Sequence, residues 1–162
     1  MSPILITSLA VGITLFLALI LRVNSILLFL SVVIGDLLSR HLGEDAAWIL
    51  ANFTKDPNIN NYTNIGLLLL PVILSLILLK KTVLGSRLFL QFVPLLLVCA
   101  TLGSLIISYL PTSLSAEYYS SSIGKIAKQS SDVLIAATAV LVMLMAWFTF
   151  RESSHRTKKG KH

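Results

Sequence analysis

The chain has 162 residues, of which 56% are hydrophobic and only 12% are charged, and its mean hydropathy is +0.87. Soluble domains carry about 25% charged residues, so this composition excludes an ordinary soluble domain and indicates a membrane protein. The formal net charge of +6 is not evidence for nucleic-acid binding, because five of the thirteen basic residues lie in the last twelve positions, as a membrane topology signal would.

The residue types that carry catalysis or hold metals do not cluster in the sequence. The single cysteine, Cys99, lies in an apolar run, so neither a disulfide nor a zinc site is expected within one chain. The histidines lack metal-ligand spacing, and the serine run Ser120–Ser122 has no histidine near it. We therefore expect no enzyme activity, no catalytic residues, no cofactor and no metal site.

The first predicted spanning helix covers residues 3–21, which carry no charge. At ~1.5 Å per residue it reaches about 28 Å, close to the ~30 Å hydrocarbon core of a bilayer. The chain start lacks Lys and Arg, so this helix is expected to be an uncleaved span, with a signal anchor as the alternative. Arg22 follows it, and Asn24 or Ser25 is expected to cap the next helix.

Residues 25–42 form the second predicted helix, which differs from the other apolar runs because it carries Asp36, Arg40 and His41. Asp36 and Arg40 are four residues apart, so they are expected to form an intramembrane ion pair. Asp36 lies about 18 Å along the helix from Asn24, in the far third of the bilayer. A structural pair near the interface is favoured over a position on an ion or substrate path.

Two stripes of small residues are expected to let helix backbones approach each other in lipid, and to be partners. The first stripe lies in the second helix and consists of Ser31, Gly35 and Ser39 at four-residue spacing. The second lies in the fourth helix and consists of Ala100, Gly103, Ser104 and Ser108.

The polar stretch 43–64 is predicted to be a loop with too few apolar residues for a core of its own. It is slightly acidic, because three carboxylates oppose Lys55. Within it, residues 46–53 are predicted to form a short interfacial helix, with Trp48 and Phe53 at the level of the lipid headgroups.

Three further helices are predicted over residues 62–79, 88–110 and 133–150, and the serine-rich residues 112–132 are expected to lie along the membrane surface. Residues 1–150 thus form one transmembrane domain, followed by a basic, disordered tail at 151–162. Its candidate contacts with anionic lipid headgroups or a partner are Arg151, Arg156, Lys158, Lys159 and Lys161.

The sequence therefore predicts an all-α, polytopic membrane bundle with five transmembrane helices. In the alternative there are four, and residues 25–42 form an interfacial or re-entrant helix. With five crossings and a cytoplasmic C-terminus, nine Lys and Arg residues are cytoplasmic and four are outside. This bias favours that orientation and places the N-terminus outside; without the second crossing, the N-terminus is cytoplasmic.

From about Ile13 to Asp132, the order of segments resembles the colicin V production family of small bacterial inner-membrane proteins. The shared features are an apolar helix that closes on Leu21-Arg22, an immediate second helix, a polar loop, two helices around the basic glycine turn 83–87, and a serine-rich segment. The first join departs from the family, because it reads Arg22-Val23 where the family has Arg-Gly. The resemblance implies a bacterial inner-membrane protein involved in export or envelope maintenance, without a defined reaction.

Together these features favour a non-enzymatic scaffold or small subunit of a larger membrane complex. Its expected partners are the lipid bilayer and other membrane subunits or further copies of itself, and no nucleic acid is expected. The alternative is a small channel or transporter in which polar residues of the second and fourth helices line the path. Asp36 and Arg40 would lie near its mouth, and Gln91 and Thr101 along it.

Overall fold

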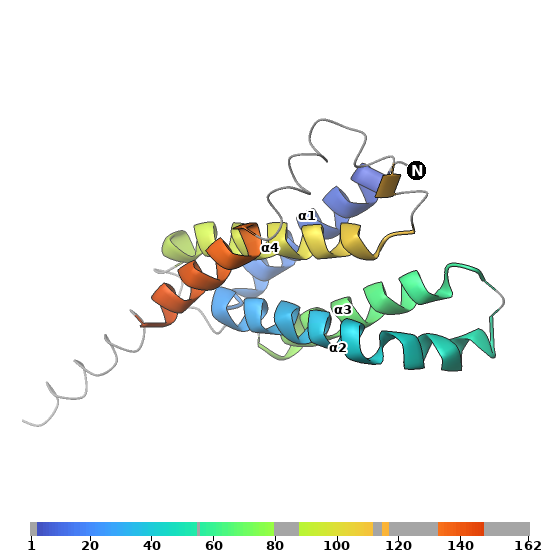
Figure 1. The fold of residues 1–162 in the computed structure, drawn as a ribbon. Coiled ribbons are helices and arrows are strands. Elements are labelled where there is room, and N and C mark those ends of the chain that lie inside the picture. Colours follow the sequence, from blue (N-terminus) through green and yellow to red (C-terminus); the bar gives the residue numbers. More distant parts are fainter. Residues whose placement is uncertain (1–2, 55, 80–87, 112–114, 117–132, 148–162) are drawn as a thin grey trace, which may run out of the picture.

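The computed structural model describes residues 3–54, 56–79, 88–111, 115–116 and 133–147 (Figure 1). The labelled helices are α1 (Pro3–Leu21), α2 (Ser25–Ala51), α3 (Ile59–Leu78) and α4 (Leu88–Tyr109). A further apolar helix, Val133–Trp147, follows them in the chain. Every regular element in these ranges is a helix, which confirms the all-α fold class.

Three helices are long and apolar enough to cross a membrane: Ser25–Ala51, Ile59–Leu78 and the part of α4 from Gln91 to Tyr109. Two more apolar stretches, Thr7–Leu21 and Val133–Trp147, are shorter. Length and composition therefore support three of the five predicted crossings. The end of the predicted fifth helix, the basic tail and most of residues 112–132 lie outside the described residues.

The join between α1 and α2 is closed by backbone hydrogen bonds. The amide of Val23 donates to the carbonyl of Ala18 (3.0 Å), and the amide of Arg22 donates to that of Leu19 (3.3 Å). This pair of hydrogen bonds is common where the first residue after a helix has a left-handed backbone conformation. Arg22 is that residue here, with a φ of 52°. The side-chain oxygen of Asn24 then accepts from the amide of Ile26 at 3.0 Å, so Asn24 caps α2.

The predicted loop over residues 43–64 is wrong, because both neighbouring helices extend into it. α2 continues past residue 42 to Ala51, so residues 46–51 of the predicted surface helix 46–53 form its last turns. α3 begins at Ile59 rather than at residue 62. Gly43 and Ala47 are buried and continue the four-residue stripe of α2, so this polar stretch still offers α3 an uncharged face.

The antiparallel α2–α3 hairpin has the most extensive contact between any two helices. A Cβ atom added at Gly35 would collide with the carbonyl oxygen of Leu68, and would lie 3.0 Å from its carbonyl carbon. One turn further along, the hydroxyl of Ser39 donates to the carbonyl of Asn64 at 3.1 Å. A Cβ atom at Gly43 would collide with the side chain of Asn64. The two backbones are thus in contact because these positions have small side chains or none.

The expectation that the two small-residue stripes pack against each other is wrong. Gly35 of the first stripe faces α3, whereas a Cβ atom at Gly103 of the second would lie 2.7 Å from a methyl group of Val11 in α1. The hydroxyls of Ser104 and Ser108 donate to carbonyls of their own helix, those of Ala100 and Ser104. Gly103 therefore admits α1 to the face of α4, while α2 approaches α3.

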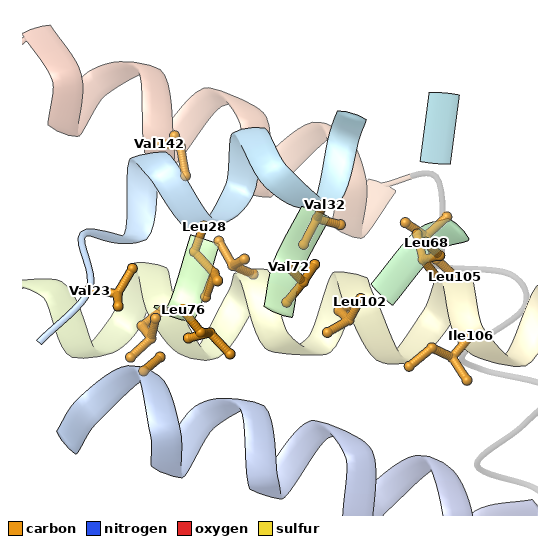
Figure 2. Packing of buried hydrophobic residues seen from close by; sticks show 13 residues of the cluster. Val23, Leu28, Val32, Leu68, Val72, Leu76, Leu102, Leu105, Ile106 and Val142 are labelled. Carbon is orange, nitrogen blue, oxygen red and sulfur yellow. The ribbon is translucent and has the colours of Figure 1, made fainter. Parts of the chain in front are cut away.

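A core of aliphatic side chains joins the helices, and α4 lies between α1 and α2 (Figure 2). Leu28 of α2, Leu68 of α3 and Leu102 of α4 have no exposed surface. The helix Val133–Trp147 joins through Val142, and through a hydroxyl–hydroxyl bond of 3.1 Å between Thr101 and Thr138. Side chains of α4 thus pack against side chains of every other helix in the described bundle.

The close contact between Gly35 and the α3 backbone can be tested by adding one methyl group at position 35. We expect Gly35→Ala to lower the free energy of unfolding by about 1–3 kcal/mol relative to Gly66→Ala, because the new Cβ must push the α3 backbone away. Gly66 is the matched control, since a Cβ atom there meets nothing within 4 Å. Both variants gain similar helix propensity. SDS titration in mixed micelles measures the difference, and equal unfolding midpoints would contradict the contact.

Candidate functional site

Polar side chains from three helices gather at one end of the bundle, where α4 stops. They come from α2, from the first turns of α3 and from the last residue of α4. We call them the polar cluster: Asp36, Ser39, Arg40, Asn61, Asn64 and Tyr109. Two of them, Asp36 and Arg40, are the candidate ion pair of the sequence.

Asp36 is the centre of the polar cluster. Its Oδ2 accepts a hydrogen bond from Nε of Arg40 at 2.9 Å, and its Oδ1 accepts one from the hydroxyl of Tyr109, also at 2.9 Å. The side chain of Arg40 is 62% exposed and that of Asp36 is 19% exposed. An exposed pair at this spacing contributes only about 0.3–0.5 kcal/mol. The bond from Tyr109 contributes more, because hydrogen bonds to charged groups are typically worth about 1.5–3 kcal/mol.

Tyr109 joins the end of α4 to the middle of α2 and to the first turn of α3. Its hydroxyl reaches Asp36 on α2, and its carbonyl oxygen accepts a hydrogen bond from the side-chain amide of Asn61 on α3 at 3.0 Å. The last carbonyls of a helix lack partners within the helix, so Asn61 satisfies one of those of α4. Together with the Ser39–Asn64 bond, these contacts fasten α2, α3 and α4 to one another where the apolar core ends.

The cluster also marks a change in the exposed surface of the bundle. On one side of it, the exposed side chains of α2 are apolar, as at Leu30, Ile34 and Leu37. From Arg40 onward the exposed positions include His41 and the carboxylates of residues 44 and 45. On α3 the same change occurs in the opposite direction, because its exposed Leu and Ile side chains begin only after the asparagine-rich first turns.

The remaining candidate residues are not brought into this cluster by any contact of the described residues. Thr101 bonds to Thr138 and to the carbonyl of Leu97, so its hydroxyl is occupied at another helix contact. The side-chain oxygen of Gln91 is buried and lacks a hydrogen-bond partner in the described part of the chain. The basic residues of the tail, 151–161, lie outside the described residues.

The chemistry available to the polar cluster is hydrogen bonding between helices. Both carboxylate oxygens of Asp36 are occupied by side chains of the same bundle. Among the residues that the structure describes, no three His, Cys, Asp or Glu side chains form a group that could hold a metal ion. The arrangement therefore acts first as a clamp between the end of α4, the start of α3 and the middle of α2.

Sequence reasoning missed Tyr109, Asn61 and Asn64 as members of the cluster. Tyr109 is the last residue of a long apolar helix, a position typical of an amphipathic ring whose hydroxyl needs a polar partner. Asn61 and Asn64 are three residues apart and so share a helix face, but Asn61 fell within the predicted loop and only Asn64 within the helix predicted over residues 62–79. Recognising α3 from Ile59 onward would have placed both asparagines on one face.

The clamp predicts a specific loss of stability. We expect Tyr109→Phe to lower the free energy of unfolding by about 1–2 kcal/mol, because the hydrogen bond to Asp36 is lost while the ring remains. Tyr62→Phe, at a half-exposed tyrosine of α3, is the matched control and should change little. A double-mutant cycle with Asp36→Asn should show coupling between the two sites. Strictly additive effects would remove Tyr109 from the clamp.

Comparison with known proteins gives no independent guide to this site. No known family matches the chain, and no curated protein or solved structure matches it. The resemblance to the colicin V production family therefore stays a prediction from the order of the segments. The function has to be argued from the geometry of the chain itself.

Proposed function

We propose that this chain is a non-enzymatic integral membrane protein that acts as a scaffold or small subunit of a larger membrane complex. The observation that carries the proposal is the small share of its apolar surface that the chain covers itself. In an apolar 18-residue stretch of α2 only 33% is buried, and in the corresponding stretch of α3 only 28%, against 56% in α4. These uncovered faces suit lipid and the helices of other subunits.

The polar cluster supports a position for the bilayer. Between the α1–α2 join and this cluster the exposed side chains of α2 are apolar, whereas charged side chains appear among them from Arg40 onward. We therefore place one boundary of the hydrocarbon layer at the cluster. The α1–α2 join, with the exposed Arg22, lies at the opposite end of α2. α4 has 22 residues, about 33 Å, which is enough to span the ~30 Å layer.

The basic residues support an orientation with five crossings. In the sequence, Arg22 lies between α1 and α2, the basic residues 80, 81 and 87 lie between α3 and α4, and the tail adds five more. Only four basic residues belong to the other end. The end with Arg22 is therefore cytoplasmic in this proposal, the N-terminus and the polar cluster are on the outer side, and the tail contacts anionic lipid headgroups. The resemblance in segment order adds a bacterial inner membrane, and a role in export or envelope maintenance.

Purification from native membranes in mild detergent tests the scaffold. We expect the chain to elute with a stoichiometric membrane partner or as a homo-oligomer, because its lipid-facing helices keep surfaces for other helices. Size-exclusion chromatography with light scattering gives the protein mass of the particle. A monodisperse monomer from membranes solubilised at several detergent concentrations would contradict the proposal.

A second candidate function is a small channel or transporter, and one observation favours it. Helices α2 and α4 meet through charged and polar side chains at Asp36 and Tyr109, where such a path would open. Ionisable groups within spanning helices often mark the routes of ions or substrates. The side-chain oxygen of Gln91, also on α4, is buried and has no hydrogen-bond partner among the described residues.

Transport is tested by flux through proteoliposomes. If the path exists, Asp36→Asn and Arg40→Gln should each change ion flux at least severalfold at equal protein content, because each alters the charge at its mouth. Leu37→Ala is the control, since Leu37 is half-exposed on the same helix and uncharged. Absence of flux in the wild type, or equal flux in all variants, would exclude this function.

A further inference from the structure

The α2–α3 hairpin continues beyond the polar cluster, past the end of α4 (Figure 1). From Arg40 to Ala51, α2 adds three further turns, about 16 Å. We call residues 41–62 the hairpin tip. In the proposed orientation the tip stands on the outer side of the membrane.

The hairpin tip carries large apolar side chains that no described part of the chain covers. Trp48 is 73% exposed, Ile49 54%, Leu50 43% and Phe53 85%. We call these four residues the tip patch. On the opposite side of the same turns, Gly43 and Ala47 are buried against α3. Trp48, Ile49 and Leu50 therefore lie on the face of α2 that α3 leaves free, and Phe53 lies in the turn that follows the helix.

We propose that the tip patch binds a basic, amphipathic helical segment of an extracytoplasmic protein. The inference rests on the proposed function for the orientation of the hairpin, and it names the kind of partner that the scaffold would recruit. The patch supplies an aromatic and aliphatic surface of the type that anchors protein interfaces.

Height above the bilayer argues against lipid as the occupant. Trp48 lies two turns beyond Arg40, about 12 Å along α2. The headgroup layer of one leaflet is only about 5–7 Å thick. With Arg40 at the hydrocarbon boundary, Trp48 and Phe53 stand above the headgroups rather than among them.

Charge argues for a basic partner. Glu44 and Asp45 are exposed one turn before Trp48, and Asp56 lies in the connection to α3. Lys55, the single basic residue between positions 43 and 62, lies outside the described residues. The acidic excess repels anionic headgroups, and it equally repels the tip of a second copy. Lysine or arginine side chains beside an apolar helix face would complement both features of the tip.

The experiment uses the full chain in nanodiscs of phosphatidylcholine. The probe is a fluorescein-labelled, 18-residue helical peptide of leucine and lysine, with a matched leucine and glutamate peptide, and binding is followed by anisotropy against empty nanodiscs. The lysine peptide should bind at least about tenfold more tightly than the glutamate peptide. Trp48→Ala with Phe53→Ala should weaken its binding at least about tenfold. Leu37→Ala, on the lipid-facing part of α2, is the matched control.

Binding measured at low and high salt separates the electrostatic contribution of the carboxylates from the hydrophobic contribution of the tip patch. Glu44→Gln with Asp45→Asn should weaken binding severalfold at low ionic strength, and the difference should shrink at 0.5 M salt, where the screening length is short. The Trp48 and Phe53 variant should stay weak at both salt concentrations. Equal binding of both peptides, or binding that survives both double variants, would overturn the proposal.

Two further outcomes would overturn it in favour of another occupant. In a Trp147→Phe background, Trp48 is the only tryptophan; its quenching by brominated lipid would place the tip in the bilayer. Dimers that dissociate in the Trp48 and Phe53 variant would identify a second copy as the occupant. Loss of peptide binding with an intact native complex refutes only this inference. A monomeric chain that still binds the peptide refutes only the proposed scaffold.

Discussion

The close approach of two helix backbones at Gly35 is the contact on which the rest of the structure depends. A carbonyl group of α3 occupies the space that a side chain at Gly35 would need. In lipid there is little hydrophobic driving force between helices, so association depends on close packing and on hydrogen bonds. The Ser39–Asn64 bond and the close approach of the Asn64 side chain to Gly43 extend the same contact toward the hairpin tip. This seam makes α2 and α3 one rigid unit on which α4 packs.

The polar cluster solves a different problem, which is how a helix can end beside two neighbours that continue past it. α4 stops at Tyr109, whereas α2 continues for three more turns. A helix that ends beside longer neighbours leaves its last carbonyls facing them, and Asn61 satisfies one of these carbonyls. The ring of Tyr109 packs with the core while its hydroxyl reaches the carboxylate of Asp36. Packing and hydrogen bonding thus meet in a single side chain.

Much of the fold follows from the sequence, because apolar length is a strong signal. Residues 3–21 and 88–110 were predicted within one residue of the observed helices, and Asn24, one of the two candidate caps, caps α2. Asp36 and Arg40 meet because helix geometry alone brings residues four apart together. The loop over residues 43–64 failed because polar composition was taken for absence of helix. The choice of α3 as the partner of Gly35 could not be predicted, since it depends on which backbone is near enough to fill the missing side chain.

The α1–α2 join has a consequence for how the chain enters a bilayer. Only three residues separate the two helices, so in the proposed topology the direction in which one helix inserts fixes the direction of the other. The apex of this join is Arg22, which holds a left-handed conformation that costs a non-glycine residue about 1–2 kcal/mol. Carrying an arginine through the centre of the membrane costs about 2.5–3.5 kcal/mol on insertion scales. The cost of moving the arginine through the membrane exceeds the cost of its backbone strain. Arg22 therefore opposes translocation of the apex, whereas a glycine at this position would relieve the strain but would not oppose translocation.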